Sequence, residues 1–192
     1  MLEKDFWISS IQKLKDTKYL AIMALFIALK VVANFVMIPV SENLFVGISF
    51  LFSAVEASII GPLAALVSGA ITDIVAFMLD SKGYPFFPGY TLSEILGIFI
   101  YALFFYRQKI TVLKICLAKF LVNAGVNALL GSLWSTMLMS KGYWFYFTQS
   151  AIKNAILLPI EVFALTLLFN ALIPLLTRRK LIEPQDSPIS LK

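Results

Sequence analysis

Six apolar stretches occupy most of this 192-residue chain, and several of them contain a charged side chain far from either end. A stretch of about 20 apolar residues can cross a bilayer as a helix. A charge at mid-membrane costs about 2.5–3.5 kcal/mol on insertion scales, so it rarely faces lipid. The charges in question are Lys30, Asp73, Lys119, Lys153 and Glu161. We therefore expect these side chains to face one another, a polar ligand or a partner protein.

The apolar stretches predict an all-α integral membrane protein, a compact bundle of six transmembrane helices. The chain is 60% hydrophobic and has a mean hydropathy of +0.88, far above an ordinary soluble domain. The expected spans are residues 18–38, 44–60, 62–80, 91–106, 110–138 and 149–177. Pro39 should end the first span, and Gly61-Pro62 should form a tight turn between the second and third. Pro159 should kink the last span.

The membrane domain covers residues 18–180, and a short segment flanks it on each side. Residues 1–17 lack the apolar core of a signal peptide. They predict a cytoplasmic amphipathic helix, because apolar residues recur at Phe6, Ile8, Ile11 and Leu14. Residues 181–192 contain two prolines and few apolar residues, and we expect a disordered tail there.

Basic residues predict the orientation in the cell membrane. With six spans, one side of the bilayer carries Lys4, Lys13, Lys15, Lys18, Arg107, Lys109, Lys114, Arg178, Arg179 and Lys180. The other side carries only Lys82 and Lys141. The positive-inside rule then places both termini of this multi-pass protein in the cytoplasm, with lipid around the bundle. No continuous basic face exists outside the membrane ends, which argues against nucleic acid as a partner.

The composition argues against an enzyme and against a bound metal or cofactor. The chain has no histidine and one cysteine, Cys116, inside an apolar run. This excludes a disulfide within the chain and histidine-based catalysis, and it removes the usual ligands of structural zinc. No GxxxxGK phosphate loop is present. An aspartyl enzyme would need a second aspartate near Asp73, and Asp80 is the only candidate.

The depth of the charges in their spans predicts which polar groups can meet. Lys30 and Asp73 each lie about 16–18 Å above the cytoplasmic start of their helices, so they should be level. Glu94 and Lys153 should form a second level pair near the outer surface. Either pair is explained by a structural ion pair or by a ligand site.

The fifth span carries a polar stripe along one helix face. Its members are Lys119, Asn123, Asn127, Gly131 and Trp134, spaced i, i+4, i+8, i+12 and i+15. The stripe indicates either hydrogen bonding between helices or a cavity wall with an aromatic cap.

Two outer loops and the first span suggest contact surfaces. Residues 80–90 and 141–147 are rich in rings, including Tyr84, Phe86 and Trp144. These rings form either an interfacial belt or a lid that stacks on a flat ligand. In the first span, Ala21, Ala24 and Ala28 form a small-residue face that permits close approach of another helix, inside or outside this chain.

Several segments together resemble the substrate-binding S components of energy-coupling factor (ECF) transporters, more specifically the folate type. They are Ile48-Ser-Phe-Leu-Phe, Gly61-Pro, Ile71-Thr-Asp-Ile, Phe87-Pro-Gly-Tyr-Thr-Leu-Ser-Glu, Gly97, Tyr101-Ala-Leu-Phe-Phe-Tyr, Lys153-Asn and Leu158-Pro-Ile. They run over most of the membrane region.

The resemblance implies a prokaryotic protein that captures folate or a related vitamin from outside the cell. It implies docking through the first-helix alanines onto a T component that works with two ATPase subunits. Asp73 and Glu94 stand in matched segments, and a carboxylate there could accept two hydrogen bonds from the aminopyrimidine edge of a pterin. Lys153 could act as a point charge on a ligand carboxylate. Tyr84, Phe86, Trp134 and Trp144 are stacking candidates from position.

Three alternatives remain open at the level of the sequence. The vitamin could be pantothenate, pyridoxine or riboflavin. The chain could be a self-sufficient proton-coupled carrier that uses Asp73 and Lys30. It could also be an assembly or scaffold subunit without a ligand, whereas the vitamin-binding alternative counts Lys30, Asn123 and Asn127 among the residues that bind the substrate.

Overall fold

The structure is a computed structural model that describes residues 4–41, 44–81, 83, 85–185 and 187–191. Its helices are α1 (Lys4–Lys13), α2 (Thr17–Phe35), α3 (Ser49–Ile60), α4 (Pro62–Leu79), α5 (Pro88–Phe105), α6 (Val112–Leu121), the π-helix η1 (Val122–Leu130), α7 (Gly131–Leu138) and α8 (Tyr143–Arg178). Two short strands, β1 (Ile38–Ser41) and β2 (Leu44–Val46), pair antiparallel between α2 and α3. Apolar helices with buried faces thus make up almost all of the fold, as expected for an all-α membrane protein.

Five helical segments among the described residues are long and apolar enough to cross a membrane. They are α2, α4, α5, the continuous run 112–138 and α8. The expected span 44–60 is not one of these long helices. Its first residues form β2, and its helix α3 has only 12 residues. The structure therefore does not confirm a count of six spans, because pairing with β1 holds residues 44–46 extended.

Two boundaries differ from the sequence prediction. The first span ends at Phe35, and Pro39 lies within β1, opposite Phe45. The last helix begins at Tyr143 instead of residue 149, so the ring-rich segment 143–147 is helical. Gly142 precedes it in extended conformation and accepts a hydrogen bond from the Phe145 backbone N–H, which starts the helix early.

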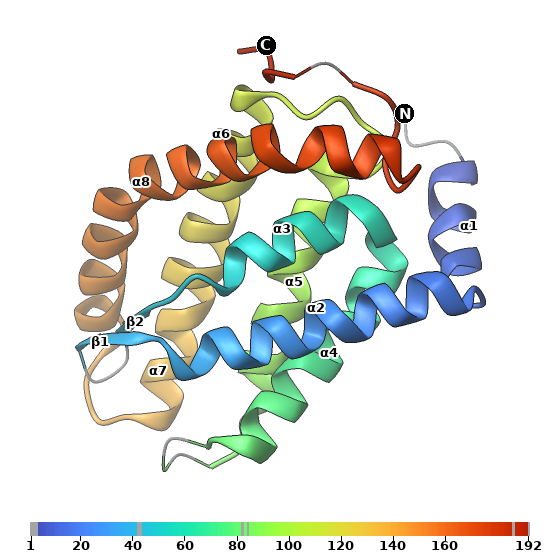
Figure 1. Cartoon of the computed structure of the whole chain (residues 1–192). Coiled ribbons are helices and arrows are strands. Elements are labelled where there is room, and N and C mark those ends of the chain that lie inside the picture. Colours follow the sequence, from blue (N-terminus) through green and yellow to red (C-terminus); the bar gives the residue numbers. More distant parts are fainter. Residues whose placement is uncertain (1–3, 42–43, 82, 84, 186, 192) are drawn as a thin grey trace.

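The predicted turn and kink are present. Gly61 separates α3 from α4 with φ +82°, a left-handed conformation that favours glycine, and Pro62 occupies the first turn of α4. Pro159 lies near the middle of α8, and Figure 1 shows this helix changing direction about half way along its length. A proline inside a helix removes one backbone hydrogen bond, which accounts for the bend.

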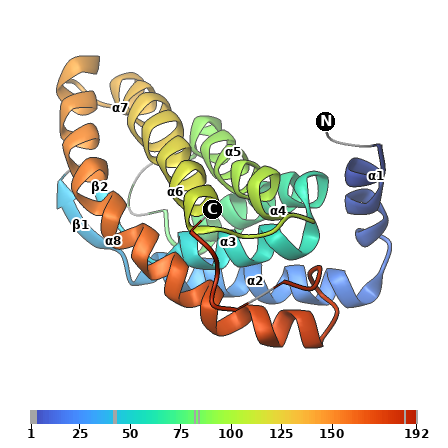
Figure 2. The same ribbon diagram turned by 90° about the horizontal axis from the view of Figure 1, so that it is seen from above.

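The ends of the elements gather at two opposite regions of the molecule. The β1–β2 hairpin, the α4–α5 loop and the α7–α8 loop lie toward one end, whereas both chain termini lie toward the other (Figure 1). Seen from above, α8 crosses the bundle along one side and α1 stands at the far edge (Figure 2). The apolar core is built from α2, α3, α4, α5, α6, η1 and α8, around residues such as Ala57, Ile98 and Phe169.

The short helix α1 lies within the N-terminal segment 1–17, and its contacts go inward. Phe6 and Ser10 are buried, whereas Ile8 and Ile11 are about half exposed. The Ser10 hydroxyl donates to the Ile60 carbonyl (3.1 Å) and accepts the Ala64 backbone N–H (3.0 Å). One side chain of α1 therefore satisfies the last carbonyl of α3 and a free N–H in the first turn of α4.

The C-terminal segment, for which we expect disorder, has no helix or strand in its described part. It nevertheless lies against the bundle. The backbone N–H groups of Val112 and Leu113, at the start of α6, donate to the carbonyls of Ser190 and Leu191. The Asn170 side chain accepts the Ile189 N–H. These contacts differ from the expectation, and they have a physical reason: the first N–H groups of a helix need acceptors.

Candidate ligand-binding site

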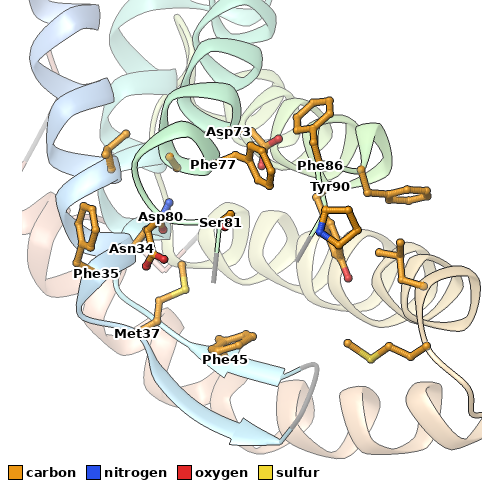
Figure 3. Close-up of a pocket in the computed structure, with 16 residues that line it drawn as sticks. Asn34, Phe35, Met37, Phe45, Asp73, Phe77, Asp80, Ser81, Phe86 and Tyr90 are labelled. Atoms are coloured by element: carbon orange, nitrogen blue, oxygen red, sulfur yellow. The ribbon is translucent and has the colours of Figure 1, made fainter. Parts of the chain in front are cut away.

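A cavity of about 290 Å³ lies at the end of the bundle that holds the hairpin and the two loops. Figure 3 shows rings around it, with Phe45 from the hairpin on one side and Phe77 and Asp73 from α4 on the other. Its lining consists of Val31, Asn34, Phe35, Met37, Phe45, Asp73, Ala76, Phe77, Asp80, Ser81, Pro85, Phe86, Phe87, Tyr90, Leu138 and Met139. Two carboxylates, Asp73 and Asp80, thus line a mostly apolar chamber that contains six aromatic rings.

Asp73 is the predicted site residue that the structure places most directly in this cavity. Its carboxylate Oδ2 accepts a hydrogen bond from the Thr91 hydroxyl of α5 at 2.6 Å. One turn before Asp73, the glycine at position 69 lets α4 approach α5 closely. A Cβ there would lie 2.9 Å from the Cα of Ile95. Asp80 follows the end of α4 in extended conformation and lines the same cavity as Asp73.

Phe86 also lines the cavity, as predicted. Its ring meets the Phe77 ring edge to face, with centroids 5.2 Å apart. Phe87 packs against both Tyr90 and Trp134 in the same geometry. These pairs leave flat apolar faces and edges around Asp73, a surface suited to a planar aromatic ligand.

Lys30 does not pair with Asp73, contrary to the depth argument. Its ammonium lies 2.7 Å from Glu56 Oε2 and donates to Ser68 Oγ at 3.1 Å. Ser68 in turn donates to Glu56 Oε1 at 2.5 Å. Both charged side chains are completely buried. Lys30 is therefore held in a closed triad that joins α2, α3 and α4.

Glu94 lies one helical turn along α5 from Tyr90, and on the same face. Its carboxylate is partly buried and interacts electrostatically with Lys30, Asp73 and Glu56. Within the described part of the chain it makes no hydrogen bond and no ion pair, and Lys153 does not contact it as the depth argument expected. Glu94 thus interacts with the charges around Asp73, but it is not among the residues that line the cavity.

The polar stripe of the fifth span binds α8 rather than lining the cavity. Lys119 forms an ion pair with Glu161 (3.0 Å), and the Asn123 amide donates to the same carboxylate (2.7 Å). The Asn127 amide donates to the Asn123 side-chain oxygen (3.2 Å), and Ser150 donates to the Asn127 carbonyl. The stripe thus forms hydrogen bonds between helices, and Asn123 also lines a second cavity of about 390 Å³ between η1 and α8.

Trp134, the last member of the predicted stripe, does not share the helix face of the others and packs against α5. Its indole N–H donates to Ser93 Oγ of α5 at 2.9 Å, and its ring lies where a side chain on Gly89 would be. The reason is η1, because a π-helix has i to i+5 hydrogen bonds and turns each residue by a smaller angle than an α-helix. Residues that follow η1 therefore point in another direction than an uninterrupted α-helix predicts.

Three further candidates have different outcomes. Lys153 donates to the Phe45 carbonyl at 3.2 Å and so ties α8 to β2 beside the cavity. Trp144 is 72% exposed, meets the rings of its neighbours Tyr143 and Phe147 edge to face, and does not line this cavity. Tyr84 lies outside the residues that the structure describes.

The three alanines of α2 face outward. Ala21, Ala24 and Ala28 are all exposed, beside the exposed apolar side chains Leu25 and Val32. This face of α2 is therefore not used for packing inside the described part of the chain.

Several residues around the site were not predicted from the sequence. Glu56, the partner of Lys30, is the only charged residue in 49–60, and that isolation was the available signal. Thr91, Phe45 and Tyr90 carried no comparable signal, because their place depends on the hairpin and on how α5 enters the bundle.

Comparisons with known proteins agree with this architecture. Residues 18–177 match the family model of the ECF transporter, substrate-specific component. The folate transporter FolT of Clostridium novyi (strain NT) is 31% identical over 148 residues, which cover 77% of this chain and 86% of that protein. A crystal structure of FolT bound with folic acid superposes with a TM-score of 0.75 at 31% identity, covering 81% of this chain and 95% of the other. The chain belongs to the family of substrate-specific components of ECF transporters.

Proposed function

We propose that this protein binds folate at the outer face of the membrane, as the substrate-specific subunit of an ATP-driven vitamin importer. The observation that carries the proposal is the cavity in which Asp73 faces a set of aromatic rings. The similarity to a FolT that was crystallised with folic acid supports the choice of vitamin.

The chemistry of the cavity suits one end of folate. A carboxylate is an acceptor only, and it can take two parallel hydrogen bonds from the adjacent N–H donors of an aminopyrimidine ring. Thr91 fixes the orientation of the Asp73 carboxylate and leaves Oδ1 available. Phe45, Phe77 and Phe86 offer faces and edges to a flat pterin.

The charges around the cavity suit a ligand with a donor-rich end and an anionic end. Around Asp73 the carboxylates of Glu56, Asp73 and Glu94 outnumber Lys30. On the α8 side, Lys119 and Lys153 outnumber Glu161. We therefore infer that the pterin lies toward α4 and α5 and that the glutamate of folate lies toward Lys153.

We also propose the rest of the transporter and the topology. The exposed alanines of α2 form the docking face for a T component, which works with two ATPase subunits. Both termini lie in the cytoplasm, as the basic residues suggest. The bundle makes six passes. Five are the long apolar helical segments, and the remaining one, second in chain order, consists of the hairpin and α3, which return the chain from one end of the bundle to the other.

A binding assay on purified protein tests the proposal. Folic acid should bind the wild type in detergent, and Asp73→Asn should lower its affinity by roughly tenfold or more, because a carboxylate loses two charge-assisted hydrogen bonds. Competition with pantothenate, pyridoxine and riboflavin identifies the preferred vitamin. Glu183→Gln, at an exposed ion pair far from the cavity, is the matched control. Tight binding of another vitamin and none of folate would refute the folate assignment.

A further inference from the structure

The second cavity, of about 390 Å³, lies between α8 and the run formed by α6 and η1, and it shares no lining residue with the cavity around Asp73. Eight of its ten lining residues are apolar, and four of these are alanines. Ala124 and Ala128 come from η1, and Ala151 and Ala155 come from the first half of α8, which runs beside it (Figure 1). The small side chains leave a space between two neighbouring helices.

This space is a groove that opens on the outer surface of the bundle and reaches inward. Phe120, Leu129 and Ala155 are exposed at its edge, whereas Ala128 and Asn154 are buried at its floor. The run 112–138 and α8 are both long and apolar enough to cross a membrane. The open side of the groove therefore faces the hydrocarbon of the bilayer.

The groove has the length of one leaflet. On α8 its lining runs from Phe147 to Leu158, which is about 16 Å along a helix. Half of the hydrocarbon core of a bilayer is about 15 Å thick. One turn before Phe147, Tyr143 stacks on the Phe147 ring at 5.8 Å, and Trp144 beside it is exposed. Tyrosine and tryptophan favour the interface between membrane and water, so the groove begins just below the headgroups.

The two polar residues of the groove are already engaged. The Asn123 amide donates to Glu161 Oε2 at 2.7 Å, and the Asn154 amide donates to the Ser150 carbonyl at 2.8 Å. The groove thus offers almost only apolar atoms to an occupant. Water does not fill an apolar space stably, and an empty space loses the dispersion contacts of its lining. The occupant that fits is a flexible apolar chain.

We propose that this groove binds one acyl chain of a membrane phospholipid, from the leaflet at the end of the bundle that holds the hairpin and the two loops. The length of the groove, its apolar walls and its opening toward hydrocarbon all match such a chain. Tyr143 and Trp144 then lie at the level of the headgroup. The site is separate from the cavity around Asp73, and it does not depend on which vitamin that cavity binds.

A photoreactive lipid tests the proposal. The wild type is placed in vesicles of phosphatidylglycerol that contain a small share of phosphatidylglycerol with a diazirine in its acyl chain. After illumination, mass spectrometry of peptides locates the attached lipid. Ala128 and Ala151, inside the groove, should be labelled at least as strongly as Ile156, which is exposed on α8 outside the groove and reports ordinary surrounding lipid.

Filling the groove from either wall should displace the chain. Ala124→Leu should lower the labelling of Ala151 fivefold or more relative to Ile156, and Ala151→Leu should do the same for Ala128. Ala171→Leu, at an exposed position of α8 outside the groove, is the matched control and should leave the labelling unchanged. Unfolding midpoints show whether each variant is folded. Because the two substitutions lie on opposite walls, either one alone is sufficient for the test.

Three outcomes would overturn the proposal. Labelling confined to exposed residues such as Ile156 would mean that only ordinary surrounding lipid is present, and would leave a helix of a partner protein as the occupant. Unchanged labelling of the groove in folded Ala124→Leu and Ala151→Leu would mean that the chain lies elsewhere. Saturating folic acid should not affect the labelling, and a loss on its addition would assign the groove to the vitamin.

Discussion

The Lys30 ammonium lies 2.7 Å from the Glu56 carboxylate, and both side chains are completely buried between α2, α3 and α4. Removing one partner would leave the other as an unpaired charge in an apolar environment. Lys30→Met and Glu56→Leu should each lower the free energy of unfolding by about 3–5 kcal/mol, and the double variant should lie close to the wild type. Thermal unfolding of the purified wild type, the two single variants and the double variant in detergent measures these changes in stability.

The exposed pair of Arg107 and Glu183 serves as the control for that cycle. Its side chains are about half exposed, so Glu183→Gln should change the free energy of unfolding by at most about 1 kcal/mol. Additive losses in the Lys30 and Glu56 double variant would contradict the assignment of these two residues as partners.

Ser10 satisfies a carbonyl and an N–H at the junction of α3 and α4 from a different helix. Ser10→Ala leaves both groups buried without that partner and should lower the free energy of unfolding by about 1–3 kcal/mol. Ile8→Ala, on the exposed side of α1, should have a smaller effect on the unfolding midpoint. Equal effects of the two changes would mean that Ser10 contributes no more than an ordinary contact.

The shifted pKa of Lys13 should make the free energy of unfolding depend on pH. Burial lowers the pKa of Lys13 from 10.5 to about 8, and the charges of Arg107 and Lys18 add to this effect. Between these two pH values the unfolded chain binds a proton at Lys13 and the folded protein does not. The free energy of unfolding should therefore rise with pH across this window. Below about pH 8 the residue is charged in both states, and the folded protein carries the full cost.

Unfolding midpoints measured below pH 8 and between pH 8 and 10.5 test the sign of this effect. The rise should be smaller in Lys13→Met than in the wild type. Lys15→Met, at an exposed position two residues further on, should keep the wild-type rise. The same slope in all three proteins would show that another group is responsible.

Local chemistry made part of the fold predictable. Apolar length located the long helices, and Gly61-Pro62 located a turn because few other dipeptides allow it. Pro159 indicated the bend of α8 for a similar reason. These signals act over a few residues, so the sequence carries them whatever the tertiary structure is.

Pairing over long distances was not predictable in the same way. The hairpin forms because residues 44–46 find a partner in β1, although the same residues would suit a helix in lipid. The π-helix turned Trp134 away from the stripe that spacing had predicted. For the site, position along a helix indicated that Asp73 lies well inside the bundle, but not that Lys30 would turn toward Glu56.

Gly61 illustrates a position where a single methyl group should be costly. It has φ +82°, and a Cβ there would lie 2.7 Å from the Tyr106 ring. Gly61→Ala should lower the unfolding midpoint through both backbone strain and this collision. Gly142→Ala, with open space around its Cα and φ −72°, should change it little. If Gly61→Ala also changed little, the close contact between the turn and Tyr106 would be wrong.

Bulk on the alanine face of α2 should separate binding from transport. Ala24 and Ala28 are exposed, so tryptophan at either position is accommodated in the isolated protein, and folic acid affinity should stay at the wild-type value. Close approach of a partner helix requires small residues, so uptake of labelled folate by cells with the complete transporter should be lost. Ile152→Trp, at an exposed site on α8, should leave both activities intact. Loss of binding together with uptake would instead mean that this face packs within the chain.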